Sequence, residues 1–205
     1  NEPSIIGPFP EQIDLVLGNQ VYVPKTDLTP SLRNRLIRLA AFQNPEFYRA
    51  QAMRFSTFGK PRIISCCEDF PKYLGLPRGC LDETVELFQS LEIKVNLIDE
   101  RFVGIPLDLE FQGELREEQQ QAANALLEHD IGVLSASTAF GKTVVAAHMI
   151  AQRKTNTLVV VHRRQLLDQW IEALSQFLGV EPKEIGQIGG GKRKPTKKID
   201  VAMVQ

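Results

Sequence analysis

The chain has 205 residues, of which 43% are hydrophobic and 24% are charged, and its formal net charge is −1. This composition is typical of a globular protein with one large or two small domains, and it excludes a chain-wide attraction for polyanions, so any nucleic-acid surface must be local. No secretory leader and no run of eighteen apolar residues is visible, which favours a cytoplasmic protein with no membrane partner.

The first predicted element is a β-hairpin. Residues 13–17 and 20–23 are apolar, strand-like stretches that flank Gly18-Asn19, a pair typical of a two-residue turn. Helices are then expected from Thr29-Pro30 and from Asn44-Pro45, because in each pair a capping side chain precedes a proline at the first helical position. The second helix should run through Met53.

The remaining elements of this part complete a small α+β domain. They are expected as a strand at 62–67, a helix at 80–91, and strands at 93–97 and 107–111. The last two stretches alternate cleanly between apolar and polar residues, as half-buried strands do. We place the domain boundary near residue 110 and expect an accessory α+β domain at 1–110.

The three cysteines show no CxxC spacing. Cys66 and Cys67 end an apolar run that begins at Ile63, so we expect their thiols in the core of a strand. Metal binding or disulfide formation by these thiols or Cys80 is the minor alternative.

From residue 111 the chain alternates helices with strands, which predicts an α/β domain with a parallel sheet covered on both faces. The expected elements are a helix at 116–129, a strand at 133–135, a helix from 144, a strand at 157–161, a helix at 164–177 and a strand at 199–204.

Residues 136–143, ASTAFGKT, fit the phosphate-binding loop pattern, with Ala136 in place of the usual first glycine. A strand that feeds a helix through such a loop directs free backbone N–H groups and the positive end of the helix dipole at one point. Lys142 would reach the β- and γ-phosphates of a nucleotide, and the Thr143 hydroxyl would ligate Mg²⁺. The alternative is an ordinary helix start that contains a glycine. The remaining candidate phosphate-binding residues are Ser137, Thr138, Ala139, Phe140 and Gly141.

Three flanking segments bear on which kind of nucleotide enzyme this is. Gln119 offers a donor and acceptors that suit the edge of adenine, although a glutamine at a helix start is usually solvated. His162 and Arg163 follow a buried strand, where they could touch a backbone phosphate or merely begin a solvated helix. Residues 188–198 combine a glycine run with five cations, which suits a polyanion but equally a solvated hairpin or mobile loop.

In order and spacing these segments resemble superfamily 2 DNA helicases and translocases of the DEAD/DEAH type, and within them the branch of restriction-enzyme motor subunits and the excision-repair helicase. The resemblance covers residues 108–205. It implies a partial RecA-like lobe at 111–205, with ATP and Mg²⁺ as cofactors and with DNA and a second RecA-like lobe of the parent chain as partners; RNA is not excluded. Lys142 and Thr143 are the implied catalytic residues, Arg116 and Gln119 the adenine readers, and His162, Arg163, Gly190 and Lys192 the nucleic-acid contacts.

The first domain is similar by position to the damage-recognition-like region of that branch. This implies a DNA-contacting role, for which surface arginines are the candidates, unless they only form ordinary surface pairs. They are Arg33, Arg35, Arg38, Arg49, Arg54 and Arg78.

A working motor also needs an acidic Asp-Glu-x-His motif and an arginine finger. Neither follows the loop before Gln205, since Asp168 is expected on a helix and Asp200 at the start of a strand. We therefore expect an N-terminal fragment of an ATP-dependent helicase or translocase that is inactive alone. The alternatives are another P-loop ATPase and a non-catalytic DNA-binding module.

Overall fold

The computed structural model describes residues 5, 7–26 and 28–204, and the chain divides into two compact units. Unit 1 is Asn1–Phe102 and unit 2 is Val103–Gln205.

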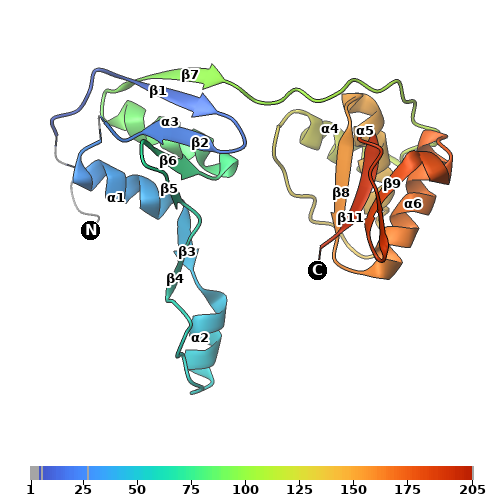
Figure 1. Ribbon diagram of the computed structural model, residues 1–205, viewed down its shortest axis with the longest axis horizontal. Helices are drawn as coiled ribbons and strands as arrows, with labels where there is room; N and C mark the ends of the chain where they lie inside the picture. Colours follow the sequence, from blue (N-terminus) through green and yellow to red (C-terminus); the bar gives the residue numbers. More distant parts are fainter. Residues whose placement is uncertain (1–4, 6, 27, 205) are drawn as a thin grey trace. The chain divides into compact units, whose positions relative to one another are not determined.

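Unit 1 is built on a mixed five-stranded sheet (Figure 1). Its strands are β1 (Gln12–Leu17), β2 (Val21–Pro24), β5 (Glu68–Asp69), β6 (Tyr73–Leu76) and β7 (Lys94–Asp99). They lie in the order β5-β6-β2-β1-β7, with β1 antiparallel to β2 and parallel to β7.

Two helices cover one face of this sheet, α1 (Pro30–Leu39) and α3 (Leu81–Ser90), the latter preceded by the 3₁₀ turn η1 (Arg78–Cys80). As predicted, Thr29 caps α1, and its Oγ1 accepts from the Leu32 N–H at 3.4 Å. Leu36 and Phe88 are fully buried against the alternate side chains of the strands. Burial of each such side chain stabilises the fold by roughly 1.5–3 kcal/mol.

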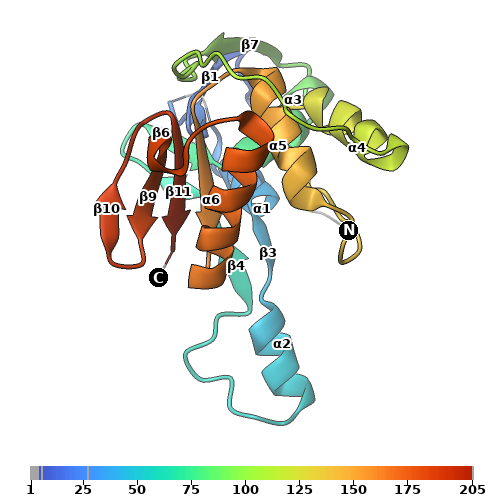
Figure 2. The same cartoon turned by 90° about the vertical axis from the view of Figure 1, so that its right-hand side faces the viewer.

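Unit 1 also contains a separate two-stranded sheet, which projects from the five-stranded one. β3 (Ala41–Gln43) and β4 (Ile63–Ser65) pair antiparallel and carry α2 (Pro45–Ala52), which lies away from the five-stranded sheet in both views (Figures 1 and 2). The helix predicted from Asn44-Pro45 is confirmed.

The predicted hairpin forms, but its turn is longer than expected. Leu17 pairs with Val21, so three residues, Gly18 to Gln20, make the turn instead of two. Gln20 leaves the strand ladder and its Nε2 donates to Glu68 Oε1 at 2.7 Å, a tertiary contact that the local sequence does not reveal.

The expectation that both adjacent thiols lie in a strand core is wrong. β4 ends at Ser65, Cys66 is exposed, and only Cys67, in the link to β5, packs partly against the core. All three cysteines are free thiols, and burial raises the pKa of Cys67 and of Cys80.

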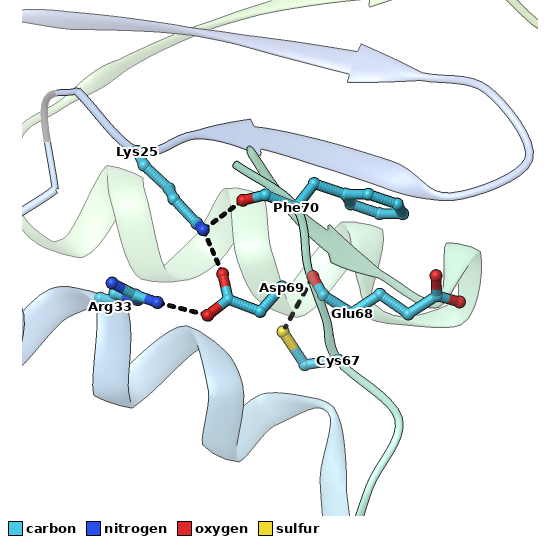
Figure 3. Close-up of polar contacts among 6 residues, drawn as sticks. All are labelled: Lys25, Arg33, Cys67, Glu68, Asp69 and Phe70. Carbon is cyan, nitrogen blue, oxygen red and sulfur yellow. Dashed lines mark hydrogen bonds and ion pairs between the residues drawn. The ribbon is translucent and has the colours of Figure 1, made fainter. Parts of the chain in front are cut away.

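Asp69 joins three segments of unit 1 (Figure 3). Its carboxylate pairs with the Lys25 ammonium and, at 2.5 Å, with the Arg33 guanidinium, while Lys25 also donates to the Phe70 carbonyl. The hydrogen bond from Lys25 is the main cause that holds the pKa of Asp69 below its usual value. Arg33, a candidate phosphate contact, is therefore engaged in an ion pair within the fold.

Unit 2 contains a four-stranded sheet in the order β10-β9-β11-β8. Its strands are β8 (Thr157–Val161), β9 (Ile185–Gly189), β10 (Lys192–Lys194) and β11 (Ile199–Met203). β11 runs parallel to both β8 and β9, and β10 returns antiparallel beside β9. The helices are α4 (Glu117–Leu127), α5 (Lys142–Arg153) and α6 (Arg164–Leu178), with a 3₁₀ turn η2 (Pro182–Glu184).

The sheet of unit 2 packs against α5 and α6. Ala147 and Leu174 lie fully buried in the same core as Val201 of β11. On the other face of β8, Leu158 and Val160 are each more than half exposed. Helices thus cover β8 on one face among the described residues, not on both as expected, although the predicted α/β class is confirmed.

Two predicted strands do not form. Residues 107–111 alternate as expected, and Leu107, Leu109 and Phe111 pack against the core of unit 2. Their backbone, however, does not join a strand. The Leu107 N–H instead donates to the carbonyl of Lys154 at the end of α5, at 2.8 Å. Residues 133–135 pair with no strand of the described chain, and Val133 is 90% exposed.

Candidate functional site

The loop before α5 has a backbone that few sequences can adopt. Ala139 and Gly141 both have left-handed φ angles, 64° and 90°, and Gly141 is the residue that caps α5. A Cβ at position 141 would also lie 2.5 Å from Gln119 Nε2. Glycine is therefore required here both by conformation and by space.

The Lys142 side chain folds back over this loop. Its ammonium donates to the Ala136 and Ser137 carbonyls at 2.5 and 2.8 Å. Within the described chain, the amides of Gly141, Lys142 and Thr143 have no protein acceptor. A cation and several free N–H groups therefore gather at the positive end of the α5 dipole, an arrangement that suits a bound anion.

Gln119 and Arg116 hold the loop from the start of α4. The Phe140 carbonyl accepts from Gln119 Nε2 at 2.7 Å and from Arg116 Nη2 at 2.6 Å. Gln119 Oε1 accepts from the Arg116 backbone N–H at 2.9 Å, and Gln119 is only 4% exposed. Both residues predicted to read adenine thus lie directly against the phosphate-loop candidate, and their contact with a base stays a prediction.

The other candidate residues lie where β8 and β9 end. His162 and Arg163 are exposed between β8 and α6, and Lys192 is exposed at the start of β10. The segment around Gly190 is a tight hairpin, one of the two conformations that its glycine run allowed. Gly189, Gly190 and Gly191 all have positive φ angles, of 100°, 60° and 83°.

Arg164 links this hairpin to α6, a role that the sequence did not reveal. Its guanidinium donates to the Gly190 carbonyl and pairs with Asp168 at 3.3 Å. Arg164 is therefore occupied in structure, whereas the neighbouring Arg163 side chain caps nothing and faces solvent.

Asp200 has a structural role. It is 8% exposed in β11, where its carboxylate accepts from the Thr196 N–H at 2.7 Å and from the Lys197 N–H at 3.1 Å. It holds the turn between β10 and β11, near the start of the strand, where the sequence predicted Asp200 to lie.

The two groups of candidate residues share unit 2 but do not touch. A cavity of about 500 Å³ is lined by Lys142 and Met149 of α5 and by Trp170 of α6, so α6 reaches the loop's side of the unit. No hydrogen bond or ion pair among the described residues connects residues 136–143 with Arg163 or Lys192.

The described part of the chain holds no cluster of three His, Cys, Asp or Glu side chains suited to a metal ion. None of the helices described is long and apolar enough to cross a membrane.

Residues 112–205 match the family described as "Type III restriction enzyme, res subunit". Over 106 residues the chain is 35% identical to "DNA 3'-5' translocase XPB2" of Sulfurisphaera tokodaii. This match covers 52% of the chain and 23% of the relative. Over 114 residues it is 40% identical to "Putative helicase 109L" of Invertebrate iridescent virus 3, which covers 54% and 32%. The matched regions thus span about a quarter to a third of these relatives.

Among solved structures, the chain is similar to the UvsW helicase from bacteriophage T4, with a TM-score of 0.61 at 14% identity. The likeness covers 94% of this chain and 74% of that one, and it concerns the fold alone. Together with the family match and the sequence relatives, this likeness supports a helicase-type domain in residues 112–205.

Proposed function

We propose that this chain is part of an ATP-dependent DNA helicase or translocase and that unit 2 binds the phosphates of ATP at residues 136–143. One observation carries the proposal. The Lys142 ammonium and the acceptor-free amides of Gly141, Lys142 and Thr143 converge at the start of α5. This donor set fits a triphosphate, because it offers charge and directed N–H groups at one point.

Each residue then has a distinct task. Lys142 would exchange its two carbonyl acceptors for phosphate oxygens, and the Thr143 hydroxyl would hold Mg²⁺, which when bound neutralises charge on the phosphates. Gln119 and Arg116, which already fix the Phe140 carbonyl, would couple the shape of the loop to the presence of adenine.

The nucleic acid would lie on the exposed groups that follow β8 and β9. His162, Arg163 and Lys192 have the exposure that phosphate contacts require, and Gly190 lies in the turn two residues before Lys192. One relative is named as a DNA translocase and another as a putative helicase, which favours DNA as the polymer.

The test is the affinity of the 205-residue chain for a fluorescent ATP analogue with Mg²⁺. Lys142→Ala removes a charged donor to the phosphates and should weaken binding by about 10- to 100-fold. Lys154→Ala, at the opposite end of α5, is the matched control and should bind as the wild type does. Equal affinity of Lys142→Ala and wild type would show that the phosphates do not bind at this loop.

No carboxylate of the described chain contacts Lys142 or Thr143. We therefore expect these 205 residues to bind ATP but to hydrolyse it at the background rate, with or without DNA. Robust DNA-stimulated turnover would contradict this part of the proposal.

A further inference from the structure

Unit 1 carries a projecting arm that the nucleotide site does not use. The arm is residues 41–65, namely β3, α2, the segment that follows α2, and β4 (Figures 1 and 2). Only the β3–β4 pair connects α2 to the five-stranded sheet, so most of the arm surface faces solvent.

The arm has its own small scaffold, so its surface is held in place. Asn44 is 6% exposed, and its Oδ1 accepts from the Glu46 N–H at 3.0 Å while its Nδ2 donates to the Pro61 carbonyl at 2.8 Å. Beside it, the buried Phe47 ring lies beneath the Arg62 guanidinium, 5.4 Å from its centroid. These contacts fix α2 against the returning strand.

Outside this scaffold, large apolar side chains face solvent. Phe58 is 95% exposed on a turn that closes with Gly59 at φ 73°, and Phe55 is 67% exposed just after α2. Clusters of exposed apolar side chains on a folded surface mark a binding site. The remaining exposed members of the cluster are Phe42, Tyr48, Met53 and Ile63.

The same arm is basic. It contains Arg49, Arg54, Lys60 and Arg62 against one acidic residue, Glu46, hence a local charge of +3 in a chain whose net charge is −1. Glu46 pairs with Lys60 at 3.9 Å, and no carboxylate of the described residues pairs with Arg49 or Arg54.

Arg54 occupies a position that favours glycine. Its φ is 58°, and it follows the C-cap of α2. There the Arg54 N–H donates to Gln51 O at 3.0 Å and the Phe55 N–H to Ala50 O at 2.8 Å. A long cation thus stands at a backbone position where its side chain brings no conformational advantage. It lies directly beside the exposed Phe55.

Aromatic side chains interleaved with cations are the surface that single-stranded nucleic acid fits, because bases stack on the rings while the cations contact phosphates. We propose that the arm, residues 41–65, binds nucleic acid, with Phe55 and Phe58 stacking on unpaired bases and Arg49 and Arg54 contacting the backbone. The arm would thus be a nucleic-acid contact in unit 1, in addition to those proposed in unit 2. The arm proposal rests on the proposed function only for the choice of DNA as the polymer.

The experiment measures binding of the 205-residue chain to a fluorescein-labelled single strand and to the matching blunt duplex, over a range of salt concentrations. Phe58→Ala should weaken single-strand binding by about 5- to 20-fold with an unchanged salt slope, because it removes stacking and not charge. Arg54→Gly should weaken binding of both polymers and reduce the salt slope by about one. It should leave the melting temperature unlowered, since glycine suits the φ of that position.

Phe102→Ala is the matched control, since Phe102 is 86% exposed and lies outside the arm. The inference is overturned if Phe58→Ala and Arg54→Gly bind the single strand as the wild type does, or if Phe102→Ala loses as much affinity as Phe58→Ala. It is equally overturned if the arm variants lose binding to anionic lipid vesicles but not to DNA.

The two proposals can fail separately. If Arg163→Ala and Lys192→Ala weaken DNA binding and the arm variants do not, the arm inference is wrong and the proposed function stands. If the arm variants weaken DNA binding but Lys142→Ala leaves ATP binding intact, the arm inference stands and the nucleotide site is wrong.

Discussion

The loop at 136–143 and the arm at 41–65 present cations in opposite ways. Lys142 is restrained by two carbonyls at the start of α5, whereas Arg54 stands at an exposed helix end without a carboxylate partner. The loop is short, contiguous and backbone-defined, so it suits one small anion. The arm spreads rings and charges over a surface, which suits a polymer.

Gly141→Ala should have the largest effect and should be confined to the loop. The new methyl group would lie 2.5 Å from Gln119 Nε2, and the alanine would have to adopt a φ of 90°, which side chains rarely allow. The loop must therefore shift. We expect ATP affinity to fall by about 30- to 100-fold, for a distortion of roughly 2–3 kcal/mol. Titration with the fluorescent ATP analogue measures it.

A Gln119→Ala background sharpens this prediction. There the obstructing amide is gone, so the same glycine substitution should cost less than in the wild type. Strictly additive effects of the two substitutions would show that Gln119 does not shape the loop.

Asn44→Ala should act on the arm alone, with an intermediate effect. It removes the cap of α2 and leaves the Pro61 carbonyl without its donor, which costs about 1–2 kcal/mol of local stability. Hydrogen exchange of α2 amides should accelerate, whereas ATP affinity should not change. Faster exchange in α5 as well would contradict the independence of the two regions.

Asp69→Asn should give the smallest effect, and one that depends on pH. The pKa of Asp69 is lower in the folded chain than in the unfolded chain, so its ion pairs stabilise unit 1 above the unfolded pKa of roughly 3.9. That contribution is lost as pH falls through the folded pKa. The melting temperatures of variant and wild type should differ at pH 7 and converge as the pH falls through the folded pKa of Asp69; a constant difference would show that the charge is not responsible.

The sequence predicts the loop better than the arm for a physical reason. The loop motif is local. Thr29 and Asn44 also act within a few residues of themselves, so the caps and starts of α1 and α2 are predicted correctly, whereas α5 begins at Lys142, two residues before the predicted start. Phe55 and Phe58 are exposed because no other segment packs against them, and nothing in the local sequence distinguishes them from core side chains.

The wrong predictions have the same origin. Residues 107–111 and 133–135 have the composition of strands, but a strand exists only where a neighbour accepts its hydrogen bonds. The Leu107 amide instead finds the Lys154 carbonyl, and Arg164, which joins α6 to Gly190, connects residues 26 positions apart. Such long-range partners cannot be inferred from one sequence.

The central claim is that ATP phosphates bind the amides at the start of α5. It is tested most directly by ¹H–¹⁵N correlation spectra of the 205-residue chain titrated with Mg²⁺ and ADP. The account predicts that the amide signals of Gly141, Lys142 and Thr143 shift most, while those of the arm stay in place. Loop signals that do not move at saturating nucleotide, or larger shifts in the arm, would contradict it.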